Sequence, residues 1–154
     1  MNRVLFLCTG NSCRSQMAEA IVNHKLGQTW QAFSAGTQPA GYVHPKAVQV
    51  LAEMGIDHQG RSKHVDQFQG YTFDLVITVC DQAAEKCPIW LGEGPVFHRG
   101  FQDPAKAAGS KEEILSTFRH VRDQIRSEIP DILHGFSPKN AKNEESEDRN
   151  DARY

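Results

Sequence analysis

The sequence predicts an α/β domain in which a four-stranded parallel sheet lies between helices, a three-layer αβα sandwich. Short apolar runs with β-branched and aromatic residues alternate along the chain with segments of helical periodicity. Strands that alternate with helices form parallel sheets, because right-handed crossovers place the helices on the faces of the sheet. The 154 residues suffice for one substantial core, so we expect a single domain over residues 1–135.

The first strand and the first helix are predicted around a short polar loop. Residues 3–7, RVLFL, form an apolar run that ends at Cys8 and indicates a buried strand. From Ser15 the apolar positions have helical spacing, and Gly27 offers a stop. Residues 29–34 alternate loosely and predict a second strand.

A second helix is predicted after a turn-rich segment. Pro45 fits its first turn, and a short helix over residues 62–70 is expected to follow it. The apolar stripe of the second helix is expected at Val48, Leu51 and Met54.

The C-terminal half supplies two more strands and a long helix. The run FDLVITV at 73–79 is a strong strand signal that ends at Cys80, and residues 95–98 predict a short fourth strand. A helix is expected from Ser110 to about residue 133, with Ser110 and Glu113 as a capping box. Its apolar positions step by three and four: Ile114, Phe118, Val121, Ile125, Ile129 and Ile132.

Composition restricts the partners and the location of the protein. Lys and Arg total 17 and Asp and Glu total 19, a formal charge of −2, which does not suggest nucleic acid as a partner. No run reaches the roughly 18 apolar residues of a membrane span, and the N-terminus becomes polar too soon for a signal peptide, so we expect a cytoplasmic protein. Residues 136–154 have almost no apolar content and predict a flexible polar tail.

The loop CTGNSCRS, residues 8–15, joins the first strand to the first helix. Ligands of parallel sheets bind at this edge, where helix N-termini present unpaired N–H groups. Gly10 and Asn11 tolerate positive φ, which lets the backbone form a concave nest for an anion. Arg14 can clamp a tetrahedral oxyanion, and Cys8 is expected as a thiolate nucleophile, aided by Ser15. The predicted oxyanion-binding residues are Thr9, Gly10, Asn11, Ser12, Cys13 and Arg14.

The other cysteines suggest redox chemistry. Without a secretory signal, four cysteines indicate catalytic, redox or metal thiols more than structural disulfides. Cys13 is expected to pack away from the anion, with a role as an oxidation partner of Cys8 left open. A zinc site formed by all four is the non-enzymatic alternative, but their spacing differs from the usual CxxC pairs, so we predict no metal and no cofactor.

The chain resembles the low-molecular-weight protein tyrosine phosphatase superfamily, and within it the arsenate reductase branch. The similarity includes CTGNSCRSQMAEA at 8–20, SAGT at 34–37, HPKAV at 44–48, ITVCD at 77–81 and FQDP at 101–104. It implies a fold of that superfamily, an arsenate or phosphate-like oxyanion as substrate, and Asp103 as the acid that protonates the leaving oxygen. The resemblance to thioredoxin-linked reductases further implies a disulfide relay through Cys8, Cys80 and Cys87, regenerated by thioredoxin or another thiol reductant.

Two points stay open within that resemblance. The alternative activity is phosphatase hydrolysis through a Cys8 phosphoenzyme, for which Tyr42 and Trp90 are either walls of the substrate site or packing residues. Related reductases bind a monovalent cation with residues that match Asn11, Glu19 and Ser34. This sequence departs from the downstream part of that pattern, since RSKHVD supplies Lys63 and His64 and no acidic ligand at those positions.

Overall fold

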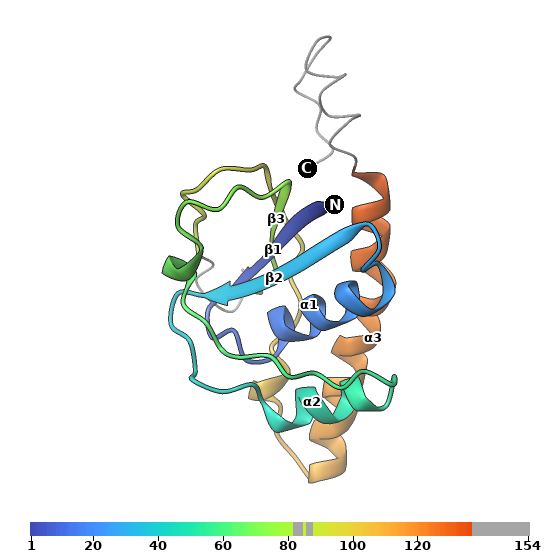
Figure 1. Cartoon of the computed structure of the whole chain (residues 1–154). Coiled ribbons are helices and arrows are strands. Elements are labelled where there is room, and N and C mark those ends of the chain that lie inside the picture. Colours follow the sequence, from blue (N-terminus) through green and yellow to red (C-terminus); the bar gives the residue numbers. More distant parts are fainter. Residues whose placement is uncertain (82–84, 86–87, 137–154) are drawn as a thin grey trace.

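The strands form one parallel sheet in the order β2-β1-β3-β4, so the predicted fold class is confirmed (Figure 1). The computed structural model describes residues 1–81, 85 and 88–136, so Cys87 and residues 137–154 of the expected tail lie outside the described residues. The elements are β1 (Asn2–Cys8), α1 (Arg14–Lys25), β2 (Trp30–Gly36), α2 (Pro45–Ala52), the 3₁₀ helix η1 (Val65–Phe68), β3 (Leu75–Thr78), β4 (Val96–His98), the 3₁₀ helix η2 (Pro104–Lys106) and α3 (Lys111–Gly135).

Strand β1 lies in the interior of the sheet and brings its last residue to the edge where the site forms. Its central residues 4–7 are fully buried, as the continuous apolar run predicts for a strand covered on both faces. Cys8 pairs with Gly36 at the end of β2, and Leu7 pairs with Thr78 at the end of β3. A Cβ at Gly36 would lie 2.3 Å from the carbonyl oxygen of Thr9, so the loop after β1 packs directly on the backbone of β2.

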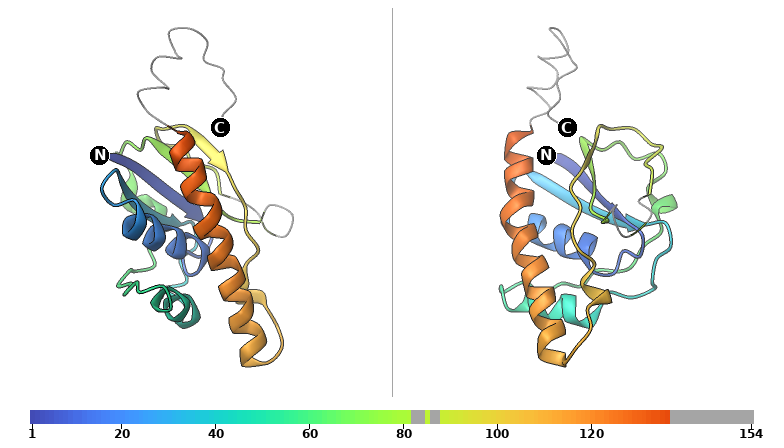
Figure 2. Two further views of the ribbon diagram at one scale, coloured as in Figure 1. Left: turned by 90° about the vertical axis from the view of Figure 1, so that its right-hand side faces the viewer. Right: turned by 180° about the vertical axis from the view of Figure 1, so that it is seen from behind.

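Helices α1 and α3 cover one face of the sheet (Figure 2). The predicted capping box at the start of α3 is present: the Ser110 hydroxyl accepts from the Glu113 amide, and the Glu113 carboxylate accepts from the Ser110 amide. The predicted stripe of α3 is also confirmed at its centre, where the side chains that pack against β1 and α1 are fully buried: Phe118, Val121, Ile125 and Ile129.

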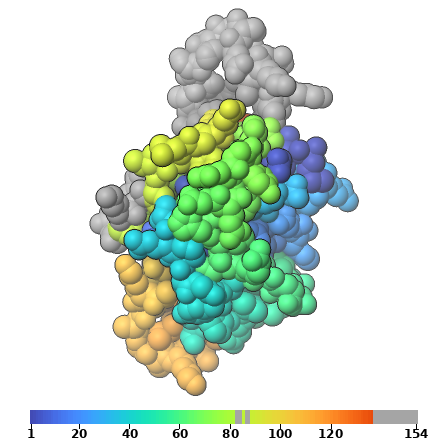
Figure 3. Space-filling model, turned by 60° about the vertical axis from the view of Figure 1, so that its left-hand side comes forward, coloured from blue at the N-terminus to red at the C-terminus, as the bar shows by residue number. Residues whose placement is uncertain are grey.

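The opposite face of the sheet is covered by η1 and irregular chain, where the sequence predicts helices. Phe33 of β2, Phe68 of η1 and Phe73 lie edge to face with ring centroids 5.6–5.9 Å apart, and Trp90 contacts Phe73 at 5.8 Å. Figure 3 shows this side of the molecule, with the green residues around η1 next to the yellow segment that leads to β4. Among the described residues, aromatic side chains and η1 form the layer on this face, and periodicity could not indicate the aromatic packing.

Two predicted elements differ in detail. Strand β3 is shorter than the run 73–79, because the chain leaves the ladder after Thr78, although Val79 still bonds to Leu7. Helix α2 buries Ala47, Val50 and Leu51, whereas Val48 and Met54 are only partly buried. The buried face of the helix is therefore rotated relative to the predicted apolar stripe. The small side chain of Ala47 allows close packing that a count of large apolar residues does not detect.

Phe136, the residue after α3, packs against the start of β2. Phe136 is buried, with its ring 5.9 Å from that of Trp30 at the start of β2. Among the described residues, no helix is both long enough and apolar enough to cross a membrane.

Candidate active site

The loop between β1 and α1 turns its amide groups inward. The carbonyls of Thr9, Gly10 and Ser12 accept hydrogen bonds from the amides of Gln38, Ala40 and His44, at 2.9–3.0 Å. In a trans peptide the N–H points opposite to the carbonyl, so the next amide along the chain faces the other side of the loop in each case. Successive inward N–H groups form the concave anion nest that the sequence predicts.

One residue of the loop has the left-handed conformation. Asn11 has φ +47°, the only positive φ at a non-glycine position among the described residues. Gly10, for which a positive φ was also expected to be tolerated, does not adopt one. Asn11 is fully buried, and its side chain accepts from the amide of Lys63 at 2.8 Å and from Gln16 Nε2 at 2.9 Å. These bonds hold a conformation that L-residues seldom adopt.

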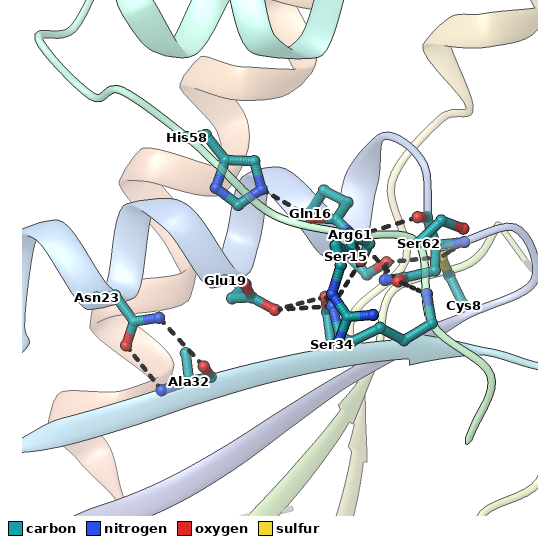
Figure 4. Close-up of polar contacts among 12 residues, drawn as sticks. Cys8, Ser15, Gln16, Glu19, Asn23, Ala32, Ser34, His58, Arg61 and Ser62 are labelled. Atoms are coloured by element: carbon teal, nitrogen blue, oxygen red, sulfur yellow. Dashed lines mark hydrogen bonds and ion pairs between the residues drawn. The ribbon is translucent and has the colours of Figure 1, made fainter. Parts of the chain in front are cut away.

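Cys8 lines the cavity and is 2% exposed, with its sulfur at the floor of the nest. The Asn11 amide donates to it at 3.3 Å, and Ser15 Oγ lies 2.9 Å from it (Figure 4). Because Ser15 Oγ already accepts from Asn11 Nδ2 at 2.9 Å, its own proton is free to point at the sulfur. Two donors on one sulfur are the pattern that a thiolate requires.

Arg14 is buried at the start of α1, and its guanidinium is shared by several acceptors. It donates two bonds to the carboxylate of Glu85 and one to the carbonyl of Phe101 at 3.1 Å, and it lies 3.7 Å from Asp103 Oδ2. Burial lowers the pKa of Arg14, but the bonds to Glu85 and the charges of Cys8, Asp103 and Glu85 outweigh that effect and raise it. The clamp is thus charged and already occupied by a carboxylate.

Glu85 is a residue of the site that sequence reasoning missed. Its carboxylate accepts from Arg14 and, at 2.9 Å, from the amide of Asp81. Burial raises the pKa of Glu85, but these hydrogen bonds and the positive charges of Arg14 and Lys106 lower it overall. An acidic residue between two cysteines was the only signal in the sequence.

Asp103 lines the same cavity, of about 660 Å³, as Cys8 and residues 9–14. Its Oδ1 accepts from the amide of Ala105 at 3.0 Å at the start of η2, which leaves Oδ2 on the side of Arg14. The structure therefore brings together a nucleophile, an anion nest, a cation and a carboxyl group that the sequence predicted as one site.

Cys13 lines the same cavity, but its thiol is not activated as a nucleophile. Its side chain is 5% exposed and belongs to the hydrophobic core, and burial, followed by the charge of Asp103, raises the pKa of its thiol to about 12. Cys13 therefore stays protonated at neutral pH.

Cys80 and the candidate substrate walls are placed differently. Cys80 is fully buried just beyond β3, at the same sheet edge as Cys8, and it is disulfide-bonded, whereas Cys8 and Cys13 are free. Tyr42 lines the cavity and is half-exposed, but Trp90 packs on Phe73 in a separate depression. Within the described ranges no group of three or more His, Cys, Asp or Glu side chains could hold a metal ion, while the zinc alternative includes Cys87, outside them.

A buried thiol in contact with a backbone amide and a hydroxyl group, in a nest beside a guanidinium and a carboxyl group, is typical of enzymes whose cysteine attacks tetrahedral oxyanions. The sequence model of the low molecular weight phosphotyrosine protein phosphatase family matches residues 3–146, and the chain belongs to this family.

Relatives within the family are chiefly reductases by name. The chain is 46% identical to an arsenate reductase of Halalkalibacterium halodurans and 44% identical to one of Shouchella clausii, with 82% of this chain and 91% of each relative covered. A low molecular weight protein tyrosine phosphatase from T. tengcongensis is similar in structure, with a TM-score of 0.68, 28% identity and coverage of 88% of this chain and all of the other. A thioredoxin-dependent arsenate reductase of Corynebacterium glutamicum has a TM-score of 0.59 and 25% identity, over 88% of this chain and 64% of the other.

The protonation of Cys13 gives a first prediction. At pH 9 iodoacetamide should modify Cys8, more slowly when phosphate is present, while Cys13 stays unmodified because its thiol is protonated. Peptide mapping by mass spectrometry measures both rates, and the same experiment in urea, where Cys13 reacts, is the control. Equal rates at Cys8 and Cys13 in the folded protein would contradict this assignment.

The occupied clamp gives a second prediction. Glu85→Gln should tighten phosphate binding about fivefold, because an incoming oxyanion no longer competes with a carboxylate for Arg14, a gain of roughly 1 kcal/mol. Titration calorimetry measures the affinity, and Glu93→Gln, at an exposed position, should leave it unchanged. Weaker binding in Glu85→Gln would mean that Glu85 orients Arg14 for the substrate.

Proposed function

We propose that the protein is an arsenate reductase whose first nucleophile is Cys8. The observation that carries this proposal is the sulfur of Cys8, which accepts from the Asn11 amide and contacts Ser15 Oγ inside a cavity that also contains Arg14 and Asp103. The similarity to proteins named arsenate reductase, at 44–46% identity over four fifths of the chain, supports the choice of substrate.

In the first step arsenate binds to the amides of residues 9–14 and to Arg14, which neutralise its charge. The Cys8 thiolate attacks arsenic, and Asp103 gives a proton to the departing oxygen, which leaves as water. A sulfur–arsenic bond forms and an arsenic–oxygen bond breaks, so arsenic is still As(V).

In the second step Cys80 reduces the adduct. Its thiolate attacks the sulfur of Cys8, a disulfide forms, and the electron pair of the broken sulfur–arsenic bond stays on arsenic, which leaves as arsenite. Cys87 then attacks Cys80 and releases Cys8 as a thiolate. The free Cys8 and the disulfide-bonded Cys80 agree with the state after this transfer, while Cys87 lies outside the described residues.

An external thiol must return the enzyme to its reduced form. We propose thioredoxin, supported by the similarity to the thioredoxin-dependent enzyme of Corynebacterium glutamicum. The expected cytoplasmic location stays a prediction. The alternative, phosphatase activity, is supported by the fold that the chain shares with the phosphatase of T. tengcongensis, but Ala105 follows the Asp-Pro pair where such enzymes usually carry an aromatic residue.

The relay gives a third prediction. Cys80→Ser should abolish arsenite production with a thioredoxin system, because no thiol can attack the Cys8 adduct, while hydrolysis of an aryl phosphate by Cys8 persists. Arsenite is measured by chromatography with arsenic detection. Cys8→Ser, the matched control, should lose both activities, and arsenite turnover by Cys80→Ser would rule out the relay.

The acid gives a fourth prediction. Asp103→Asn should slow the single-turnover attack step by roughly 100-fold, because the departing oxygen is no longer protonated, with little change in phosphate affinity. Rapid quench measures the rate and titration calorimetry the affinity. An unchanged rate would remove Asp103 from the mechanism.

A further inference from the structure

A buried ammonium group lies behind the anion nest, away from the substrate cavity. Lys63 Nζ donates to the carbonyl of Arg61 at 2.7 Å and to Ser34 Oγ at 3.4 Å, and it lies 3.6 Å from Glu19 Oε1. Ser34 Oγ in turn donates to Glu19 Oε1 at 2.6 Å. The side chains of Lys63 and Glu19 are only 13% and 16% exposed, and Ser34 is fully buried.

These groups come from three separate parts of the fold. Glu19 belongs to α1, Ser34 to β2, and Arg61 and Lys63 to the segment between α2 and η1 (Figure 4). Without the ammonium group, a carboxylate, a hydroxyl oxygen and a carbonyl oxygen would face one another with no positive charge between them. Such a set of oxygen atoms requires a cation.

The cluster is joined to the nucleophile by a short chain of hydrogen bonds. The amide of Lys63 donates to Asn11 Oδ1 at 2.8 Å, Asn11 Nδ2 donates to Ser15 Oγ, and Ser15 lies against the sulfur of Cys8. The carbonyl of Lys63 also accepts from the amide of Gly36 at 2.9 Å, which fixes the segment on the end of β2. A shift of Lys63 would therefore move the donors that point at the nucleophile.

Burial of this lysine is a cost to the folded state. Burial lowers the pKa of Lys63 below its ordinary value, and the attraction of Glu19 does not fully compensate. A group whose folded pKa is lowered stabilises the fold only above its unfolded pKa, so at neutral pH the charged lysine destabilises it.

We propose that the ammonium group of Lys63 is a built-in monovalent cation that holds the anion nest in shape, so that the protein needs no dissociable one. Lys63 is a positioning residue: it touches neither substrate nor sulfur and acts through Asn11 and Ser15. It occupies the site left open in the sequence, since its Nζ lies against Glu19 and Ser34. The inference rests on the proposed function only for the turnover measurement.

The first test compares salts at equal ionic strength on the intact wild-type protein. The rate of arsenate turnover and the pH at which iodoacetamide alkylation of Cys8 is half-maximal should be the same in potassium chloride and in tetramethylammonium chloride, whose cation is too large for the cluster. A requirement of the wild-type protein for potassium would overturn the proposal.

The second test empties the site. In tetramethylammonium chloride, Lys63→Ala should lose about tenfold in kcat/KM and shift the alkylation midpoint of Cys8 to higher pH, because the donors to the sulfur lose their support. Potassium or ammonium chloride should restore most of both, by binding where the amine was. Lys25→Ala, at an exposed position in the last turn of α1, should behave as wild type in every salt.

Two further outcomes decide the matter. Unchanged behaviour of Lys63→Ala, or a defect that neither potassium nor ammonium relieves, would overturn the proposal. If Lys63→Ala does not fold, Lys63→Met, which keeps most of the packing, takes its place. Its thermal unfolding midpoint should be higher in potassium chloride than in tetramethylammonium chloride. Equal midpoints in the two salts would contradict the inference. The alkylation profile does not involve arsenate, so its result stands even if the reductase assignment fails.

Discussion

The site depends on the way one sulfur atom is held. The Cys8 sulfur accepts from the Asn11 amide at 3.3 Å and lies 2.9 Å from the Ser15 hydroxyl, and the Asn11 amide reaches it from a backbone at φ +47°. That conformation is costly for an L-residue and persists because the carbonyls of the loop bond to residues 38–44, while the Asn11 side chain is bonded on both sides. The backbone amides of the nest are thus already oriented before an anion enters.

The charges of the cavity follow from the burial of Arg14. A guanidinium in a mostly apolar setting is costly unless acceptors surround it, and Glu85, Phe101 and Asp103 supply them before any substrate binds. The cation is stabilised at some loss of affinity, because an oxyanion has to replace the Glu85 contact. This exchange favours ligands of high charge density, such as arsenate and phosphate, over weak anions.

The sequence predicted those parts of the molecule whose structure is determined by residues that are close together in the chain. The apolar run of β1, the capping box of α3 and the loop from Cys8 to Ser15 are each set by neighbouring residues, and each was recognised. Contacts made by long side chains across the fold were not: Glu85 reaches Arg14 over 71 positions of sequence separation. Gln16, which bonds Asn11 and the carbonyl of Arg61, was read only as part of a helix. The aromatic layer over β2 was missed for the same reason, since its members come from distant segments.

The loop alone does not choose between hydrolysis and reduction, because both begin with the same attack on the same kind of anion. Which reaction follows depends on the nucleophile that reaches the adduct on Cys8. Water attacks the central atom of the anion and leaves its oxidation state unchanged. A thiol attacks the sulfur of Cys8 and leaves two electrons on the central atom. Strands β1 and β3 end at the same edge of the sheet, so the fully buried Cys80, which follows β3, lies at the same edge as Cys8, which is 2% exposed. A cysteine two residues beyond β3, at the edge where β1 also ends, makes the strand end, and not the anion nest, the part of the fold that would commit the proposed enzyme to reduction.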